Sequence, residues 1–377
     1  MRSLLFISTN SMWSGSEELW ARSAHSFIQE SYSVAFATKF EHPELNKLNA
    51  RYINFANRYS SKTLIQRGIE RFSNYPFKIK DKLKEFIREI SPELVIISQG
   101  NNYESLEIMQ ICNELKLSYV TITQLVSDLF IWISEKDNFL KYQKAYLGAI
   151  KNFFVSKNNL SLNNFILGCE LPNAEVTYNP CKLSKKDITV FPDNDNEYCI
   201  GMVGRIECWH KGYDLFLQVI NQDKWKERPV YFNMYGEGPH SEFIKRYISH
   251  YGLSNLTLKG YSNDVRKIWQ DNQILLMPSR HEGQALALIE AMWCQRAAIV
   301  TNVGGAAELI EEGHNGFIAD TATFGCIDAA LERAWAQRSQ WKQMGLKAAA
   351  TLNTKYPPYA VDFFNQQIKI ILVRERS

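Results

Sequence analysis

The stretch ILLMPSRHEGQALALIEAM, residues 274–292, joins a short apolar run to an apolar helical segment through a polar turn. Residues 274–277 are continuously apolar, as expected of a strand that is buried on both faces of a parallel sheet. The apolar periodicity resumes near Gln284 and predicts that a helix begins there. Such a strand–turn–helix element leaves free backbone N–H groups at the helix start, and these groups favour an anion.

Two carboxylates belong to this element. Glu282 lies in the turn and can project over the same opening, whereas Glu290 is the one acid in the apolar run 285–293. A carboxylate in a helix that is apolar nearly all round is expected to be largely buried, and it needs a partner to offset desolvation. That partner is either a neighbouring Arg or Lys or a pair of ligand hydroxyls, such as those of a ribose.

The same alternation of apolar runs and helical stretches extends in both directions along the chain. Stretches such as 81–90 and 284–294 are long enough for crossover helices between parallel strands. The expected strands are residues 4–7, 33–37, 94–97, 119–122, 153–155, 199–203, 230–234, 274–277 and 298–300.

A polar string from Lys182 to Glu197 separates two α/β halves and is typical of a linker. After Pro357 and Pro358, apolar residues at 360, 364, 368 and 371 predict one face of a closing helix. We therefore expect an α/β protein with domains over 1–182 and 183–357, and with a C-terminal helix over 358–377.

Composition excludes several classes of protein. The 377 residues include 43 Lys and Arg against 40 Asp and Glu, too near neutrality to demand a nucleic-acid partner. Seven Cys without a C-x-x-C pair indicate reduced thiols and no zinc site. The start MRSLLFISTN has too short an apolar run for a signal peptide, and no run approaches 18 apolar residues. We expect a cytoplasmic protein.

A second motif, GMVGRIECWHKGYD, spans residues 201–214. An apolar strand ends in Gly204-Arg205, and a short loop then delivers Lys211 ahead of an apolar helix. Arg provides a planar guanidinium group with several N–H donors, and Lys provides a compact positive charge. The two side chains are together suited to binding a diphosphate. Taken alone, the two cations are equally compatible with a solvated loop, and His210 is interpreted as solvated or structural.

Glycines follow three further apolar runs, in YGEGP (235–239), LKGY (258–261) and NVGG (302–305). Each places permissive backbone at the carboxyl end of an expected parallel strand, where ligands of open α/β sheets bind. Any one of these turns could serve simple chain reversal. Their common position beside the two motifs above favours a binding site.

In order and spacing, these motifs resemble retaining glycosyltransferases of the large family-4 group, the glycosyl transferases group 1. The resemblance is specific across roughly 200–320 and weaker over the first 180 residues. It implies the GT-B fold: two Rossmann-like domains with an interdomain cleft, and a C-terminal helix that crosses back to the first domain. The N-terminal domain would then lie on the acceptor side, and the C-terminal domain would bind a nucleotide sugar.

The resemblance also implies roles for particular residues. Arg205 and Lys211 would bind the donor diphosphate, Glu282 would contact hydroxyls of the donor sugar, and these three form the expected catalytic set. Glu290 would contact the nucleotide ribose, and side chains near Tyr261 would influence the choice of base. The other expected donor-binding residues are Gly204, Gly283, Gln284, Ala285 and Gly15.

The N-terminal half departs from the family pattern at two positions. Many family members carry a Gly-Gly-x-Glu loop after the first strand, and the corresponding residues here are Ser14-Gly15-Ser16-Glu17. Gly15 can still approach the donor phosphate or the acceptor, but the side chain of Ser14 adds steric hindrance. Many members also carry a His at the end of a later strand, and in this chain that position is occupied by Gln124. Gln can donate a hydrogen bond but cannot shuttle a proton near neutral pH.

The implied reaction moves a sugar from a nucleotide diphosphate to a saccharide or lipid-linked acceptor, in surface polysaccharide or glycoconjugate synthesis. It proceeds by front-face displacement, with the nucleotide sugar as co-substrate and with no cofactor or metal ion. Asp193-x-Asp195 matches an acidic pair that metal-dependent sugar transferases use, but it lies in the linker ahead of a strand, so a metal role is not favoured.

The stretch from residue 51 to 88 contains ten Lys and Arg but only three Asp and Glu, and aromatic residues are interleaved with them. This stretch could dock on the anionic inner face of a membrane or on a lipid-linked acceptor, or it could be a solvated helix face. Two other functions remain open. One is a sugar-nucleotide epimerase of the same fold, and the other is a non-catalytic subunit of a polysaccharide-assembly complex, which Ser14 and Gln124 make credible.

Overall fold

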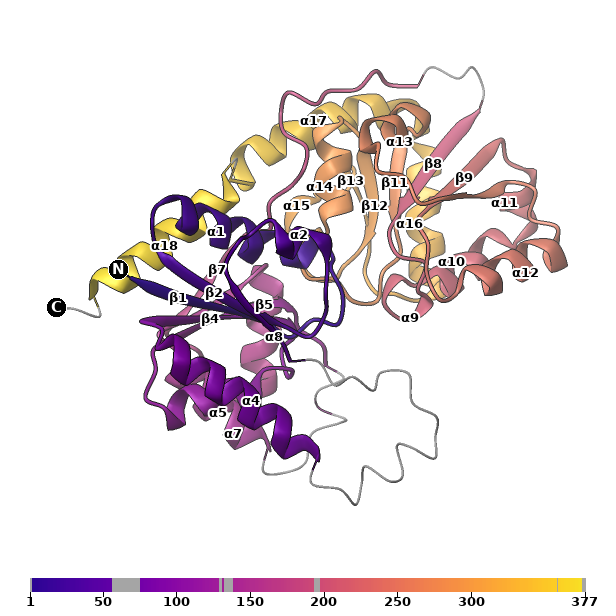
Figure 1. The fold of residues 1–377 in the computed structure, drawn as a ribbon. Helices are drawn as coiled ribbons and strands as arrows, with labels where there is room; N and C mark the ends of the chain where they lie inside the picture. Colours follow the sequence, from indigo (N-terminus) through magenta and orange to yellow (C-terminus); the bar gives the residue numbers. More distant parts are fainter. Residues whose placement is uncertain are drawn as a thin grey trace. The chain divides into compact units, whose positions relative to one another are not determined.

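The computed structural model describes residues 2–55, 75–128, 131, 138–192, 197–357 and 359–374. The chain forms two compact units. Unit 1 comprises Met1–Pro180 with Tyr359–Ser377, and unit 2 comprises Cys181–Pro358. Each unit is built on a parallel sheet flanked by helices (Figure 1), so the predicted α/β class is confirmed.

In the described part of unit 1, seven parallel strands follow the order β3-β2-β1-β4-β5-β6-β7. Alternate residues of each strand face opposite sides of this sheet. Leu4 and Phe6 join a core with α1 (Glu18–Gln29) and α18 (Ala360–Arg374), whereas Leu5 and Ile7 join the core formed with the helices of the other face. The strands are β1 Ser3–Ser8, β2 Ser33–Thr38, β3 Arg51–Asn54, β4 Leu94–Asn101, β5 Tyr119–Leu125, β6 Lys151–Phe154 and β7 Ala174–Val176. The other helices of unit 1 are η1 Gly15–Glu17, α2 Pro43–Asn46, α4 Tyr75–Ile90, α5 Leu106–Glu114, α7 Asn138–Gly148 and α8 Lys157–Leu167.

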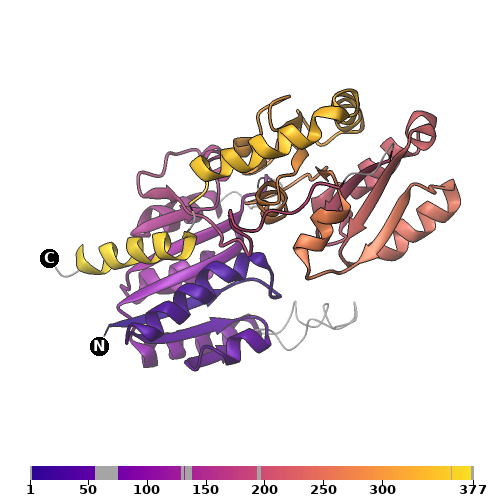
Figure 2. The same cartoon turned by 90° about the horizontal axis from the view of Figure 1, so that it is seen from above.

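Helix α18 completes unit 1 from the far end of the chain. It runs alongside α1 (Figure 2). Phe364 is fully buried and its ring lies 5.1 Å from that of Phe153 in β6, while Asn365 accepts a hydrogen bond from Ser23 of α1. The four apolar positions predicted for the closing helix are all buried.

Unit 2 repeats the architecture. Six parallel strands of its described part follow the order β10-β9-β8-β11-β12-β13. Ile200 and Met202 form a core with α10 and α16 on one face, and Gly201 on the opposite face lies against Trp269 of α13. The strands are β8 Tyr198–Val203, β9 Val230–Tyr235, β10 Leu256–Gly260, β11 Ile274–Met277, β12 Ala297–Thr301 and β13 Gly316–Ala319. The helices are α9 Cys208–Lys211, α10 Tyr213–Ile220, α11 Asp223–Glu227, α12 Ser241–Tyr251, α13 Val265–Asp271, α14 Leu286–Trp293, α15 Ala306–Leu309, α16 Phe324–Ala336, η2 Arg338–Gln340 and α17 Trp341–Lys355.

The strand order of unit 2 creates a topological switch point between β8 and β11. The chain winds outward through β9 and β10 on one side and through β12 and β13 on the other. Crossover connections on the two sides leave in opposite directions at such a point, and a crevice opens at the carboxyl ends of the two central strands. The two main motifs continue from the ends of β8 and β11, so both lie at this switch point.

Some local expectations need correction. The helix expected to begin near Gln284 begins at Leu286, and the strand expected over 153–155 ends at Phe154. Strands β3, β7 and β13 were not among the expected strands. None of the residues of β3 and β7 is buried and they carry little apolar signal, whereas β13 was missed although most of its residues are buried. None of the described helices is long and apolar enough to cross a bilayer.

Candidate functional site

Glycines allow the loops at the carboxyl edge of the unit 2 sheet to approach one another closely. A Cβ atom on Gly236, after β9, would lie 1.9 Å from the carbonyl oxygen of Gly204, after β8. At Gly304, after β12, it would lie 2.1 Å from the carbonyl oxygen of Glu282, and φ there is 53°. No side chain fits at either place, so the glycine turns noted in the sequence bring these loops into backbone contact.

An ion pair joins the two main motifs. The Nζ atom of Lys211, at the end of α9, lies 2.7 Å from Oε1 of Glu282 in the loop between β11 and α14. Ser279 donates its hydroxyl to the same carboxylate oxygen at 2.7 Å, and Glu282 is only 9% exposed. The stem of Lys211 passes over Gly204, where a Cβ would lie 3.5 Å from Cε. A largely buried carboxylate and a partly exposed ammonium group thus lie together at the switch point.

The turn that carries Lys211 is held from several sides. Glu207 caps α9 by accepting from the N–H groups of Trp209 and His210, at 2.9 and 2.8 Å. Gly212 ends the turn in a left-handed conformation, with φ 65°, and a Cβ there would lie 2.0 Å from the carbonyl oxygen of Pro278. The position of Lys211 is therefore fixed by backbone geometry.

Arg280 fastens the same turn to the loop after β11. Its guanidinium group binds both carboxylate oxygens of Asp214 at 2.7 Å and donates to the carbonyl of Cys208 at 2.8 Å. Burial alone would raise the pKa of Asp214, but the hydrogen bonds and charge of Arg280 outweigh it, and that pKa is lowered. Arg280 and Ser279 were not singled out from the sequence, although both lie inside its most informative stretch.

Arg205 contrasts with Lys211. Its side chain is exposed and has no hydrogen bond or ion pair with any described residue. The guanidinium group is thus available to a ligand at the end of β8. Gly283 and Ala285 are buried in the loop before α14, and Ala285, at the helix N-cap, provides no side-chain cap.

Glu290 lies on α14 and is partly buried. Burial raises the pKa of its carboxyl group to about 7, and the nearby charge of Lys182 only partly opposes this effect. No hydrogen bond or ion pair reaches the carboxylate from the described residues. The interpretation that a neighbouring Arg or Lys pairs with Glu290 is therefore not supported, and the carboxylate is available to a ligand.

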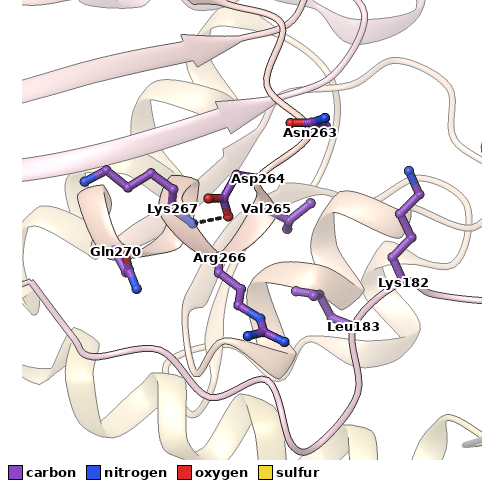
Figure 3. A pocket seen from close by; sticks show the side chains of 8 residues that line it. All are labelled: Lys182, Leu183, Asn263, Asp264, Val265, Arg266, Lys267 and Gln270. Carbon is purple, nitrogen blue, oxygen red and sulfur yellow. Dashed lines mark hydrogen bonds between the residues drawn. The ribbon is translucent and has the colours of Figure 1, made fainter.

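A pocket of about 410 Å³ lies between the start of unit 2 and α13 (Figure 3). Lys182, the cation that influences Glu290, belongs to its lining. Asp264 accepts a hydrogen bond from the backbone of Lys267 and so shapes one wall, while Tyr261, at the end of β10, is 69% exposed. The other lining residues are Leu183, Asn263, Val265, Arg266 and Gln270.

In unit 1, the loop with Gly15 is held by buried polar contacts. Glu17 is fully buried and accepts hydrogen bonds from Ser8 at 2.7 Å and from Trp20 at 2.8 Å, and burial raises its pKa. Gln124 donates to the carbonyl of Ser16 at 3.0 Å and accepts from Asn179 at 2.7 Å.

These contacts bear on the two departures from the family pattern. Ser14 is exposed and has a φ of −152°, which any residue adopts, so the backbone does not require glycine there. Gln124 uses both ends of its amide to tie the loop to the segment after β7. Its observed contacts are those of a residue that positions the loop.

Two sequence hypotheses lie partly or wholly outside the described residues. Asp193 and Asp195 belong to the segment 193–196, and residues 56–74 form the middle of the basic stretch. Within the ranges that the structure describes, no group of three or more His, Cys, Asp or Glu side chains could hold a metal ion.

Comparison with known proteins agrees with the fold of the chain. Over nearly its whole length, 99%, the chain superposes on all of Anabaena Alr3699/HepE, whose structure contains UDP, with a TM-score of 0.74 and 16% identity. The fold is therefore that of the GT-B glycosyltransferases. Residues 197–336, which lie in unit 2, match the model of the family Glycosyl transferases group 1.

Relatives match over shorter segments. A poly(ribitol-phosphate) alpha-N-acetylglucosaminyltransferase of Staphylococcus aureus is 32% identical over 112 residues, which cover 29% of this chain and 23% of that protein. An N,N'-diacetylbacillosaminyl-diphospho-undecaprenol alpha-1,3-N-acetylgalactosaminyltransferase of Campylobacter jejuni is 28% identical over 130 residues, 34% of this chain and 32% of that one. The chain spans less than half the length of these curated relatives.

Proposed function

We propose that the protein is a retaining, metal-independent glycosyltransferase that moves a sugar from a nucleotide-diphosphate donor to a saccharide or lipid-linked acceptor. The pairing of Lys211 with Glu282 at the switch point, 2.7 Å apart, carries this proposal. One group attracts a phosphate and the other accepts hydrogen bonds from hydroxyls, so together they fit the two sides of a sugar–phosphate bond.

The donor would occupy unit 2 in an extended form. Lys211 and the exposed Arg205 bind the diphosphate, assisted by the backbone N–H groups before α14, and Glu282 orients the sugar. Glu290 accepts hydrogen bonds from the ribose hydroxyls, which supply the partner that this carboxylate lacks within the described part of the protein. The base then extends into the pocket beside Lys182, lined in part by Asn263 and Asp264.

In the proposed reaction, the acceptor hydroxyl attacks the anomeric carbon on the face from which the nucleotide diphosphate departs. The bond from that carbon to the phosphate oxygen breaks, the new glycosidic bond forms on the same face, and the departing phosphate takes the acceptor proton. Arg205 and Lys211 stabilise the charge that grows on the diphosphate. Gly15 and the loop that Gln124 positions would contribute to acceptor binding in unit 1.

Several features support acceptors of this class. The relative from Campylobacter jejuni is named for an undecaprenol-linked acceptor, and the one from Staphylococcus aureus for a poly(ribitol-phosphate) acceptor. A role in surface polysaccharide or glycoconjugate synthesis, at the cytoplasmic side of a membrane, follows from the same proposal. The basic stretch 51–88 would then contact anionic lipid, which flotation with anionic liposomes at moderate salt would test.

The test is calorimetric titration with UDP-, GDP- and ADP-sugars, followed by transfer assays with the donor that binds. We expect Arg205→Ala and Lys211→Ala each to lower kcat/KM about a hundredfold, a loss of about 3 kcal/mol of transition-state stabilisation. The double variant should also lose donor binding. A chelator should leave the rate unchanged.

Near-normal turnover in both single variants would contradict the assignment. Binding of no nucleotide sugar by the wild-type protein would favour the alternative of a non-catalytic subunit. Binding and conversion of the donor sugar without an acceptor would favour the epimerase.

A further inference from the structure

Trp209 is an exception among the tryptophans of the structure. It is 55% exposed, whereas every other tryptophan in the described part of the chain is buried or partly buried. An indole ring in water forgoes the large stabilisation that burial of an aromatic side chain provides. An exposed indole therefore stands out when it belongs to a rigid part of a binding site.

The turn around Trp209 is rigid. The backbone N–H of Trp209 donates to the carboxylate of Glu207. The backbone N–H groups of Arg280 and His281 both donate to the carbonyl of His210, at 2.7 and 3.2 Å. The imidazole of His281 lies beside the indole, with ring centroids 6.1 Å apart and an interplanar angle of 30°. The backbone at Trp209 is consequently held in place, and a second ring lies beside the indole.

A polar side chain binds the backbone of the same turn. The Nδ1 atom of His240 accepts from the N–H of Cys208 at 3.0 Å, so a neutral His240 carries its proton on Nε2. Its side chain is 41% exposed. An exposed aromatic ring, on a turn whose backbone binds a partly exposed imidazole, matches a pyranose ring, which has an apolar face of C–H groups and a rim of hydroxyls.

We propose that Trp209 is a stacking surface for a pyranose ring of the acceptor, an inference that rests on the proposed function. The partial positive charge on the ring C–H groups is attracted to the negative face of the indole. In a front-face reaction the acceptor approaches on the side of the leaving diphosphate, and Trp209 lies in sequence between the two proposed diphosphate ligands, Arg205 and Lys211. The donor sugar belongs at Glu282, which is far less exposed than Trp209.

The experiment is ¹⁹F NMR of the full chain labelled with 5-fluorotryptophan and saturated with UDP. The resonance absent from Trp209→Tyr identifies Trp209. We expect this resonance to shift on addition of millimolar methyl α-glycosides of glucose, galactose or N-acetylglucosamine, and not with mannitol, an open-chain polyol. If none of the glycosides moves it, or if mannitol moves it equally, the proposal is wrong.

Two variants separate stacking from general apolar contact. We expect Trp209→Tyr to retain glycoside binding, and Trp209→Leu to bind about threefold to tenfold more weakly, because Leu is apolar but has no aromatic face. Equal binding by the Leu and Tyr variants would overturn the proposal.

A measurement of donor binding distinguishes failure of the stacking proposal from failure of the proposed function. Trp209→Leu should bind the nucleotide sugar as the wild type does. If donor binding falls together with glycoside binding, Trp209 is a structural part of the diphosphate site and the stacking proposal is overturned. If the wild type binds no nucleotide sugar at all, the proposed function fails and the stacking proposal fails with it.

Discussion

Glu290, at the scale of one residue, is a carboxyl group on a helix whose other residues are all apolar. Its carboxyl group is removed from water without a protein partner in the described structure, and burial raises its pKa to about 7. A helix position of this kind would be more stable with an apolar residue. The unfavourable placement is explained if a ligand with paired hydroxyls completes the site.

A pH dependence follows from this placement. Between about pH 4.5 and 7 the folded state holds a proton on Glu290 that the unfolded state has released, so raising the pH through this window lowers stability. Above pH 7 the penalty is on the order of 3 kcal/mol. We expect Glu290→Gln to equal the wild type near pH 4.5 and to exceed it by a similar amount at pH 8, measured by urea unfolding.

A second variant provides the control for this experiment. The charge of Lys182 lowers the pKa of Glu290 in the folded state, so Lys182→Met should extend the pH-dependent loss of stability to higher pH. The prediction is wrong if the difference between Glu290→Gln and the wild type does not change with pH.

At the scale of one element, the turn from α9 to α10 depends on Gly212. A Cβ atom there would overlap the carbonyl oxygen of Pro278, and φ is 65°. Gly252, which ends α12, has a similar φ of 61°, but a Cβ there would meet nothing within 4 Å. Substitution of Gly252 by Ala therefore measures the free-energy cost of the backbone conformation alone, whereas substitution of Gly212 by Ala adds the cost of steric overlap.

We expect Gly212→Ala to destabilise unit 2 by about 3 kcal/mol or more, and Gly252→Ala by about 1 kcal/mol. Gly212→Ala should also weaken donor binding, because it displaces the turn that carries Lys211. Thermal unfolding and calorimetric titration would measure the two effects. Equal destabilisation by both variants would show that the contact with Pro278 is not tight in solution.

At the scale of the whole molecule, unit 1 is assembled from both ends of the chain. Phe364 of α18 enters a core with residues of β1, β2, β4 and α1. Removal of a fully buried Phe side chain costs both its transfer free energy and the cavity that remains. The last helix is therefore part of the folding unit that begins at the N-terminus.

We expect Phe364→Ala to destabilise unit 1 by about 3 to 5 kcal/mol, and the control Ile370→Ala, at a site 38% exposed, by no more than about 0.5 kcal/mol. Hydrogen exchange can follow each unit separately. Amide protection should fall in β1 and β4 and stay unchanged in β8 and β11. An equal loss in all four strands would contradict the assignment of α18 to unit 1.

Local apolar periodicity and short motifs predict the α/β class, the position of most strands and the residue types of the candidate site from the sequence alone. Continuous apolar runs such as 274–277 identify buried strands without further information. The short strands β3 and β7 were missed because none of their residues is buried, and β13 was missed although most of its residues are buried.

Which of these residues lie in contact depends on the three-dimensional arrangement of the strands. Lys211 and Glu282 are 71 residues apart, and they form a pair because β8 and β11 are neighbours at the centre of the sheet. The absence of a described protein partner for Glu290 and the exposure of Trp209 likewise depend on side chains distant in sequence. The local sequence pattern determines which functional side chains each segment carries. The strand order results from packing of the whole unit, and it determines which of these side chains come into contact.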